Sequence, residues 1–161
     1  MRAPAVELGP GGIADLDAVM TVMDDSFDPR FGEAWTASQC AGLLPMPGVW
    51  LILAREDGAT IGFALGRAVA GEAELLLLAV RRNAQGRGIG KMLLDRFSEE
   101  ATERGATRLH LEVREGNHAL NLYERADFTL VGRRRNYYSG HAGQTYDALT
   151  LARNATTMSM Q

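Results

Sequence analysis

Apolar and polar positions recur along this chain with two different periods, which separate helices from strands. Between Ile13 and Phe27 the apolar residues return every three or four positions, as expected for an amphipathic helix. Residues 107–114 instead alternate between apolar and polar side chains, which predicts a strand with one buried face. The segment from Glu74 to Val80 is almost entirely apolar, so we expect a central strand that is buried on both faces.

Turn and capping residues mark where these elements begin and end. Asp57-Gly58 between two apolar segments predicts a β-hairpin. Thr36 is suited to cap the start of a short helix, and Gly105 to end a longer one. The order βααβββαβαββ predicts an α/β fold with a mixed sheet and helices on its faces. The expected elements are a strand at 6–8, helices at 13–27 and 35–45, strands at 49–55, 60–70 and 74–80, a helix ending near 104, a strand at 107–114, a helix at 117–125, and strands at 128–135 and 144–151, before a frayed tail at 153–161.

Residues 75–91 combine an apolar run, a glycine-rich turn and the start of a helical pattern, LLLLAVRRNAQGRGIGK. In such a unit, free N–H groups and the positive end of the helix dipole point at one place, which suits an anion. Glycine also lets the main chain approach a phosphate closely. The segment predicts a phosphate-binding loop, and the alternative is a glycine-rich turn without a ligand.

The spacing of this loop excludes two common phosphate-binding motifs. A P-loop places four residues before its Gly-Lys pair and then Ser or Thr, whereas three residues separate Gly86 from Gly90 and Met92 follows the lysine. A dinucleotide fingerprint has the form GxGxxG near the start of a βαβ unit. The GRGIG segment is one residue shorter and lies in the middle of the chain. The remaining pattern is QxxGxG, beginning at Gln85.

This pattern resembles the pyrophosphate loop of the GNAT superfamily of acetyl-CoA-dependent N-acetyltransferases. The element order is also that of the GNAT fold, over roughly residues 5–152. Downstream, LEVR at 111–114, LYE at 122–124 and RRNYY at 134–138 resemble the RimI family, bacterial enzymes that acetylate the N-terminal alanine of a small-subunit ribosomal protein. The resemblance implies a single GNAT domain over residues 1–152, with a mixed, mostly antiparallel central sheet flanked by helices. It also implies acetyl-CoA as the donor and coenzyme A as a product.

The resemblance implies roles for individual residues. It places a general base at Glu112 and a general acid at Tyr123. The residues implied to bind the coenzyme are Leu78, Ala79, Val80, Gln85, Gly86, Arg87, Gly88, Ile89, Gly90, Lys91 and Asn117. The residues implied to bind the peptide substrate are Trp35, Arg134, Arg135, Asn136, Tyr137 and Tyr138.

Other interpretations of these positions stay open. Without the resemblance, Glu112 is a solvent-facing residue on an alternating strand and Tyr123 is a core tyrosine. The chain has one residue fewer than the family pattern between Asn117 and Tyr123, which displaces either the asparagine or the helix start. Asp127 stands where the family has glycine before Phe128, and Asp tolerates a positive φ at modest cost.

The chemistry of these residue types fits direct acetyl transfer. An α-amine has a pKa of about 7.7–8.0, so at neutral pH a nearby carboxylate must take a proton before the amine can attack. A tyrosine hydroxyl can protonate the departing thiolate, and a backbone N–H at a break in strand 75–80 could polarise the acetyl carbonyl. No covalent acyl-enzyme is needed, because the bound reactants have a high effective molarity.

Composition narrows the class of protein. The 161 residues are 46% hydrophobic and 23% charged, with a net charge of −3, which argues against nucleic-acid binding. Cys40 is the only cysteine, and the histidines at 110, 118 and 141 have no metal-ligand spacing, so we expect no disulfide and no metal site. No apolar stretch reaches about 18 residues, so we expect no membrane partner and a cytoplasmic location.

The substrate and partners follow from the resemblance. We expect the N-terminus of a ribosomal protein or a similar peptide as the acceptor, and a monomer or weak dimer as the oligomeric state. The alternatives are a GNAT enzyme acting on another protein N-terminus or a small amine, and a non-catalytic acyl-CoA-binding module. The presence of both Glu112 and Tyr123 argues against the last alternative.

Overall fold

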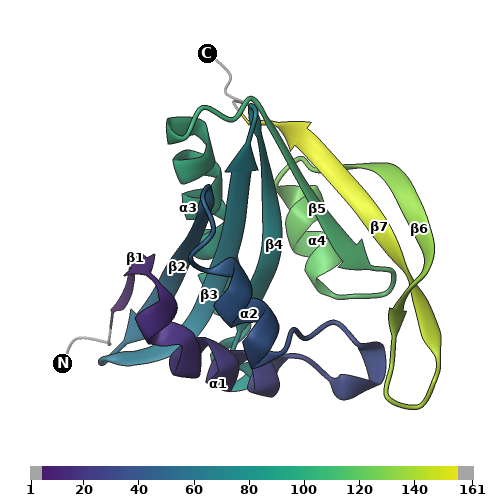
Figure 1. The fold of residues 1–161 in the computed structure, drawn as a ribbon, viewed down its shortest axis with the longest axis horizontal. Helices are drawn as coiled ribbons and strands as arrows, with labels where there is room; N and C mark the ends of the chain where they lie inside the picture. The colour runs from purple at the N-terminus through teal and green to yellow at the C-terminus, as the bar shows by residue number, and fades with distance from the viewer. Residues whose placement is uncertain (1–4, 156–161) are drawn as a thin grey trace.

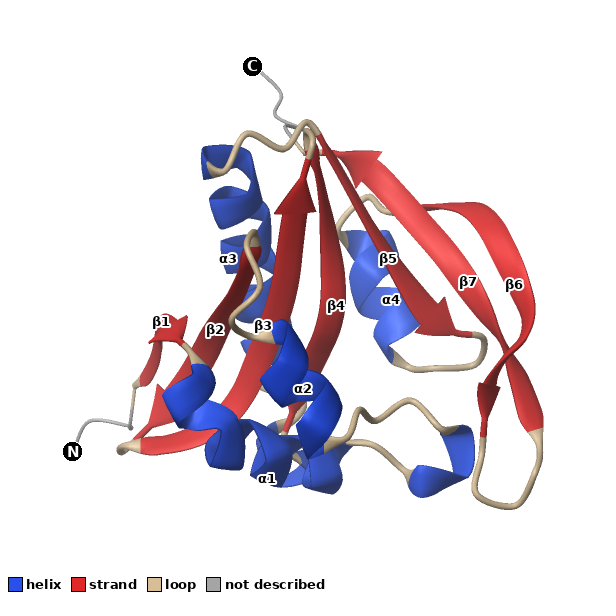
Figure 2. Ribbon diagram, viewed as in Figure 1, coloured by secondary structure: helices blue, strands red, loops and turns tan. Residues whose placement is uncertain are grey.

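A computed structural model describes residues 5–155 and confirms the expected α/β architecture. Within this range, a seven-stranded sheet is flanked by four α-helices (Figures 1 and 2). The observed order is βααβββαβαββ, as predicted. The elements are β1 (Val6–Gly11), α1 (Leu16–Ser26), α2 (Ala37–Leu43), β2 (Val49–Glu56), β3 (Ala59–Val69), β4 (Glu72–Val80), α3 (Ile89–Glu103), β5 (Arg108–Arg114), α4 (Ala119–Arg125), β6 (Thr129–Ser139) and β7 (Thr145–Asn154), with 3₁₀ turns at Ile13–Asp15, Pro29–Phe31 and Arg82–Ala84.

The sheet has the strand order β1-β2-β3-β4-β5-β7-β6. Its neighbouring strands are antiparallel except for β4 and β5, which run parallel. That parallel ladder is short, since it pairs only Glu72–Leu75 with Arg108–Leu111. Beyond Leu75 the two strands diverge, so the sheet is joined at one end and open at the other (Figure 2).

Two hydrophobic cores lie on opposite faces of the sheet. Helices α1 and α2 cover β2, β3 and part of β4 on one face, while α3 and α4 cover the other (Figure 1). Phe97 and Leu93 of α3 are fully buried in the larger core, and Met23 of α1 is fully buried in the smaller one. Both cores reach β4, which therefore lies at the centre of the molecule and is buried as predicted.

A β-bulge interrupts β4 near the point where β5 leaves it. Leu65 of β3 pairs with Leu77 and Gly66 pairs with Leu75, so Leu76 has no opposite residue. The bulge also reverses the faces of the strand, because Leu75 packs in the α3/α4 core and Leu77 in the α1/α2 core. The expected break within strand 75–80 is therefore confirmed.

Several local sequence signals act as predicted. The Thr36 hydroxyl accepts a hydrogen bond from the Gln39 N–H at 3.1 Å and caps α2. The β2–β3 hairpin turns at Asp57 and Gly58, which have φ values of 52° and 80°. Asp127 has a φ of 71°, so the position that carries glycine in the family pattern does need the left-handed conformation here.

The N-terminal strand is longer than the sequence indicated. We expected Gly9 and Pro10 to end it, but β1 continues to Gly11 and pairs Pro10 with Ile52. Proline is tolerated there because β1 is an edge strand, on which a missing N–H need not break a ladder. The helix expected from Ile13 begins instead with a 3₁₀ turn, and α1 proper starts at Leu16.

The two closing strands are also longer than expected. Strand β6 runs to Ser139, where it pairs with Thr145 of β7, and β7 runs to Asn154, where it pairs with Arg108 of β5. Residues 153 and 154 therefore belong to the sheet, and Ala155 is buried, whereas we placed all three in a frayed tail. The rest of that expected tail, residues 156–161, lies outside the described residues.

Candidate active site

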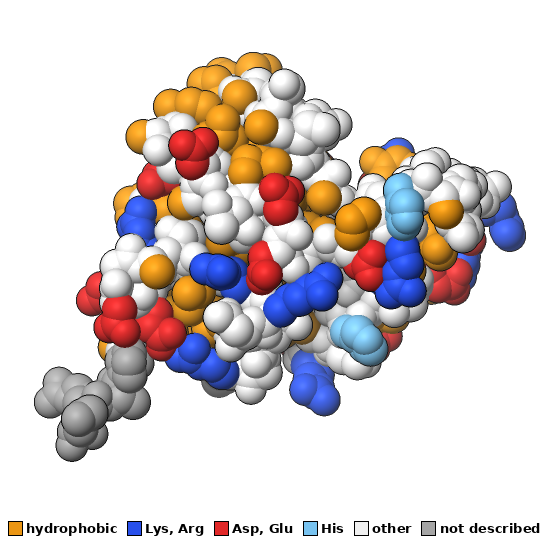
Figure 3. All heavy atoms as spheres, turned by 90° about the horizontal axis from the view of Figure 1, so that it is seen from below, with side chains coloured by type: hydrophobic (Ala, Val, Ile, Leu, Met, Phe, Trp, Pro, Cys, Tyr) orange, Lys and Arg blue, Asp and Glu red, His pale blue; other side chains and the backbone are white. Residues whose placement is uncertain are grey.

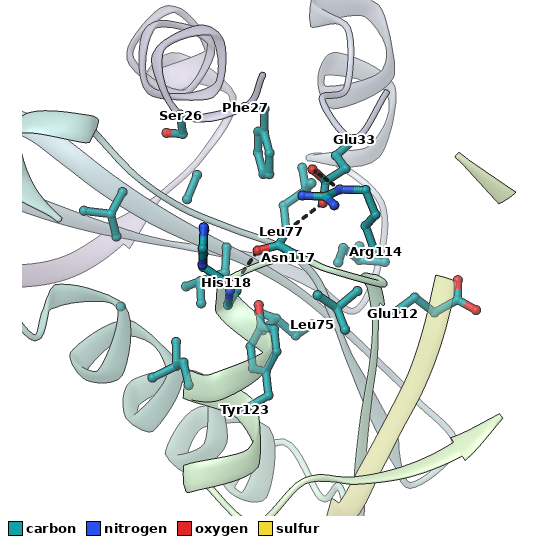
Figure 4. Close-up of a pocket in the computed structure, with 18 of the residues that line it drawn as sticks. Ser26, Phe27, Glu33, Leu75, Leu77, Glu112, Arg114, Asn117, His118 and Tyr123 are labelled. Carbon is teal, nitrogen blue, oxygen red and sulfur yellow. Dashed lines mark hydrogen bonds and ion pairs between the residues drawn. The ribbon is translucent and has the colours of Figure 1, made fainter. Parts of the chain in front are cut away.

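A cavity of about 740 Å³ opens where β4 and β5 separate. Its lining comes from the α1–α2 loop, β4, the glycine-rich loop, β5, α4 and β6 (Figure 4). The predicted site residues that line it are Trp35, Leu78, Ala79, Val80, Gln85, Gly86, Gly88, Ile89, Gly90, Glu112, Asn117, Tyr123, Tyr137 and Tyr138. One continuous space therefore connects the predicted phosphate loop with the predicted catalytic pair and part of the predicted peptide segment.

The glycine-rich loop has the geometry of an anion site. Gly86 and Gly88 have φ values of 79° and 83°, and a Cβ at either position would meet no atom within 4 Å. Gly88 is the N-cap of α3 and offers no side-chain acceptor to the first helical turn. The N–H groups of that turn are therefore available to a pyrophosphate, and the residues present fit the coenzyme that the resemblance implies.

The charged residues of the loop turn away from the cavity. Arg87 forms an ion pair with Glu56, and Lys91 forms one with Asp95 at 2.7 Å. Neither lines the cavity, in contrast to the glycines between them. The Gln85 side-chain amide donates a hydrogen bond to the Val80 carbonyl at 2.9 Å, which fixes the loop against the end of β4.

Tyr123 projects from α4 into the cavity, with its hydroxyl directed toward Asn117 and His118 in Figure 4. Its ring is buried and packs edge-to-face on Phe128 at 6.1 Å. Burial raises the pKa of Tyr123 well above its ordinary value of 10.0, and the negative charge of Glu33 adds to the effect. The hydroxyl is therefore protonated at neutral pH and can act only as a proton donor or neutral hydrogen-bond partner.

Glu112 lies on β5 and lines the same cavity, but its carboxylate is already paired. Its Oε2 is 2.6 Å from Arg134 Nε and accepts a hydrogen bond from the Thr150 hydroxyl at 3.3 Å. In Figure 4 the carboxylate points away from Tyr123. The structure brings the two predicted catalytic residues to one cavity without placing them side by side.

Asn117 precedes α4 rather than opening it, because the helix begins at Ala119. Its Oδ1 accepts a hydrogen bond from the Ala119 N–H at 2.8 Å, and its Nδ2 donates to Glu33 Oε2 at 2.7 Å. The helix therefore begins two residues after Asn117, where we expected Asn117 to begin it. Both ends of the amide are engaged at the cavity wall.

The RRNYY segment divides into residues that face the cavity and residues that do not. Tyr137 and Tyr138 line it, whereas Arg135 is exposed and Arg134 pairs with Glu112. Asn136 has a φ of 54° at an irregularity of β6, and its N–H donates to Asp147 at 2.9 Å. Asn136 therefore shapes the strand and does not line the cavity.

The ion pair of Glu33 and Arg114 in the cavity wall was missed by the sequence reasoning. Glu33 and Arg114 pair at 3.1 Å, and the Arg114 guanidinium lies 3.7 Å from the centre of the Phe31 ring. We treated the loop containing Glu33 only as a break between helices. Its position two residues before Trp35, and the placement of Arg114 two residues after Glu112, are the signals that could have identified them.

The described residues give three further findings. In residues 5–155 no helix combines the length and apolar character needed to cross a bilayer. Over the same range, no group of three or more His, Cys, Asp or Glu side chains is arranged to hold a metal ion. On the face shown in Figure 3, basic and acidic side chains are interspersed with apolar ones, so neither sign of charge dominates that face.

Comparison with known proteins assigns the fold to a family. The family described as "Acetyltransferase (GNAT) family" matches residues 16–128. A Haemophilus influenzae [ribosomal protein bS18]-alanine N-acetyltransferase is 40% identical over 97 residues, which are 60% of this chain and 66% of that protein. The match thus spans slightly less than two thirds of that relative. The Mycobacterium tuberculosis N-alpha-acetyltransferase RimI is 36% identical over 138 residues, covering 83% of this chain and 80% of that protein.

Solved structures agree in fold. The Escherichia coli ribosomal-protein-S18-alanine N-acetyltransferase superposes with a TM-score of 0.84 at 28% identity, covering 98% of this chain and 97% of that one. Arabidopsis thaliana NAA60, solved in complex with acetyl-CoA, has a TM-score of 0.80 at 20% identity, covering 93% of this chain and 98% of that one, and shares the fold. The chain therefore belongs to the acetyltransferase (GNAT) family, whose enzymes take the acetyl group from acetyl-CoA.

Proposed function

We propose that this protein transfers an acetyl group from acetyl-CoA to the α-amine of the N-terminal alanine of ribosomal protein bS18. The relatives from Haemophilus influenzae and Escherichia coli carry that activity in their names. The observation that carries the proposal is the single cavity that runs from the glycine-rich loop to Tyr138. Such a cavity can hold a coenzyme at the glycine-rich loop and a peptide near Tyr138 at the same time.

The coenzyme side of the site is supplied by backbone groups. Gly86 to Gly90 would hold the pyrophosphate at the N-terminus of α3, where the helix dipole favours negative charge. Residues 78–80 of β4 lie beyond the end of the β4–β5 ladder, so an extended ligand arm could run along them. Acetyl-CoA supplies the acetyl group as an activated thioester. The bulge at Leu76 would leave a backbone N–H near the acetyl carbonyl.

Glu112 accepts the proton of the attacking amine in this mechanism. It lines the cavity, and its carboxylate can act directly or through one water. Arg134 holds one of its oxygens, so the other remains available as an acceptor. The pairing holds the carboxylate in one orientation while the peptide enters beside Tyr138.

Tyr123 donates a proton to the sulfur that leaves. Its hydroxyl points into the cavity, and burial raises its pKa, so the proton is present throughout the neutral range. The amine attacks directly, because no residue needs to carry the acetyl group when both reactants are held together. Since ribosomal proteins are synthesised in the cytoplasm, the proposal implies that this protein works there.

The test is thiol release from acetyl-CoA with three acceptors. These are a peptide with the bS18 N-terminus and a free alanine, the same peptide with a blocked N-terminus and a free internal lysine, and a small polyamine. Turnover confined to the first acceptor, with the acetyl group located on the α-amine by mass spectrometry, supports the proposal. Turnover only on the polyamine indicates a small-amine enzyme, and tight acetyl-CoA binding without turnover indicates a binding module. Either result overturns the proposal.

A further inference from the structure

The Glu33 carboxylate lies in the wall of the cavity and is held there by two hydrogen bonds. It lies in the loop between α1 and α2, and it lines the same space as Tyr123 and Tyr138. Arg114 Nε donates a hydrogen bond to Oε1 at 3.1 Å, and Asn117 Nδ2 donates to Oε2 at 2.7 Å (Figure 4). Only 10% of the Glu33 side chain is exposed. Its charge is therefore fixed in place before any substrate arrives.

The two hydrogen bonds leave Glu33 with unused capacity. An ionised carboxylate has about four acceptor positions, and Arg114 and Asn117 occupy one on each oxygen. The remainder of the Arg114 guanidinium is engaged elsewhere. It lies over the Phe31 ring, and Nη1 donates to the Glu115 carbonyl at 3.1 Å. Each oxygen of Glu33 can therefore accept a further hydrogen bond.

The negative charge of Glu33 raises the pKa of the hydroxyls of Tyr123 and Tyr138. After burial, Glu33 is the largest cause that raises the pKa of Tyr123 and of Tyr138. Arg114 opposes this effect at Tyr138 only as the smallest contribution, and it makes none at Tyr123. The cation beside Glu33 thus does not cancel its field where the tyrosine hydroxyls lie. The charge of Glu33 therefore favours a positive group beside either hydroxyl.

We propose that Glu33 binds the α-ammonium group of the incoming protein N-terminus next to the Tyr123 hydroxyl. The inference rests on the proposed function and adds to it the residue that recognises the charged amine. Glu112 retains a different task, because its Oε2 is 2.6 Å from Arg134 Nε and its carboxylate points away from Tyr123. Glu33 holds the protonated amine, and Glu112 takes one of its protons before the neutral amine attacks the thioester. The second proton lost from the nitrogen replaces the one that Tyr123 gives to the departing sulfur.

The experiment measures how strongly each enzyme variant distinguishes an ammonium group from a neutral hydroxyl. The two ligands are the bS18 peptide and the same peptide with a 2-hydroxypropionyl group in place of the N-terminal alanine. Calorimetric titrations are made with saturating coenzyme A at about pH 6.5, where most of the α-amine is protonated. We expect the wild type to bind the ammonium peptide roughly tenfold or more tightly, the factor typical of a hydrogen bond to a charged group.

The Glu33→Gln variant separates charge recognition from loop structure. Glutamine preserves the size of the side chain and one acceptor oxygen, which can serve Asn117, but it removes the charge and the acceptor that Arg114 Nε uses. We expect the ratio of the two peptide affinities to fall to about one, while Glu112→Gln keeps the wild-type ratio. The exposed Glu103→Gln, at the end of α3, is the matched control and should also keep it. Glu33→Asp retains the charge at a greater distance, so it should give an intermediate ratio.

Each of the following outcomes overturns the inference. An equal loss of affinity for both peptides in Glu33→Gln shows a purely structural role for Glu33. A wild-type ratio near one, or a ratio lost in Glu112→Gln instead, places ammonium recognition elsewhere while the proposed function still stands. If the wild type binds neither peptide and does not acetylate the alanine peptide, the proposed function fails and this inference fails with it. Should Glu33→Gln not fold, judged by its thermal midpoint, Glu33→Asp must still lower the ratio.

Discussion

At the residue scale, the Tyr123 hydroxyl is the group whose surroundings restrict its chemistry most. Replacing it in Tyr123→Phe should lower kcat by roughly 10², the lower range for loss of a general acid, and leave coenzyme affinity unchanged. Because burial raises the pKa of Tyr123 above 10.0, the active protonated form persists as the pH rises. The wild-type kcat should therefore show no alkaline fall between about pH 7 and 9. A pH–rate profile checks both points, and a Phe variant of wild-type rate would contradict the assignment.

For Glu112, in contrast to Tyr123, we predict an effect on kcat that changes with pH. The Glu112→Gln variant should lose roughly 10² in kcat at neutral pH, because the amine must then lose its proton to water. The deficit should shrink as the pH passes about 8, where the α-amine deprotonates unaided. Steady-state kinetics at several pH values, with acetyl-CoA affinity measured in parallel, test this. A deficit that stays constant with pH would assign Glu112 a purely structural role beside Arg134.

The roles of single residues were predictable only where local sequence carries them. Asp127 adopts a positive φ, as its place before Phe128 indicated, because that requirement is set by neighbouring residues. The contact of Glu33 with Asn117 joins positions 84 residues apart, and no periodicity or turn signal encodes it. Contacts of this kind depend on how separate loops dock, so they appear only in the folded molecule.

At the scale of elements, the glycine-rich loop and the start of α3 form the proposed phosphate site. Gly88→Val should weaken acetyl-CoA binding by roughly tenfold or more, because Val disfavours the φ of 83° and places methyl groups where the phosphates approach. The matched control is Gly58→Val in the β2–β3 hairpin, which has a φ of 80° and equally open surroundings. Both variants lose stability, but only the first should change the Kd in a coenzyme titration. Equal Kd values for the two variants would show that the glycine-rich loop does not bind the coenzyme.

The α1–α2 loop and the end of the β6–β7 hairpin lie so close together that only glycine fits at position 140. A Cβ on Gly140 would lie 1.9 Å from the Arg30 carbonyl oxygen, so Gly140→Ala must separate the two segments. We expect the KM for the alanine peptide to rise roughly 10-fold to 100-fold, since the loop carrying Glu33 would be displaced. The coenzyme Kd should not change. Gly9→Ala, which meets no atom within 4 Å, is the control. Equal peptide KM values for the two variants would show that this contact does not position the loop.

Element types were predictable here to a greater extent than the irregularities that form the site. Periodicity and turn residues located the helices and strands, because both signals act within a few residues of the chain. A break within strand 75–80 was expected, but its position at Leu76 was not visible in an all-leucine run, since that position depends on the register of β3 against β4. The greater lengths of β6 and β7 arise in the same way, because β6 ends where it pairs with β7 and β7 ends where it pairs with β5.

At the scale of the whole molecule, the sheet consists of two antiparallel units that meet along one short parallel ladder. Strands β1 to β4 form one unit, and β5, β7 and β6 form the other. Only Glu72–Leu75 and Arg108–Leu111 pair across the boundary, and the cavity occupies the open end. A ligand in the cavity therefore contacts both units at the end where no ladder joins them to each other. Binding should stabilise the entire fold rather than one loop.

That arrangement predicts both the size and the place of the stabilisation. Coenzyme A at 100 times its Kd should add about 2.7 kcal/mol, which raises the thermal midpoint of a domain of this size by about 5–11 °C. Amide exchange should slow most at residues 77–80 and 112–114, beyond the parallel ladder. It should slow least at residues 72–75 and 108–111, which pair with each other before any ligand binds. Gly88→Val at the same ligand concentration should show a smaller shift. If protection increased only in the glycine-rich loop, the ligand would not join the two units, and the cavity between β4 and β5 would not be its binding site.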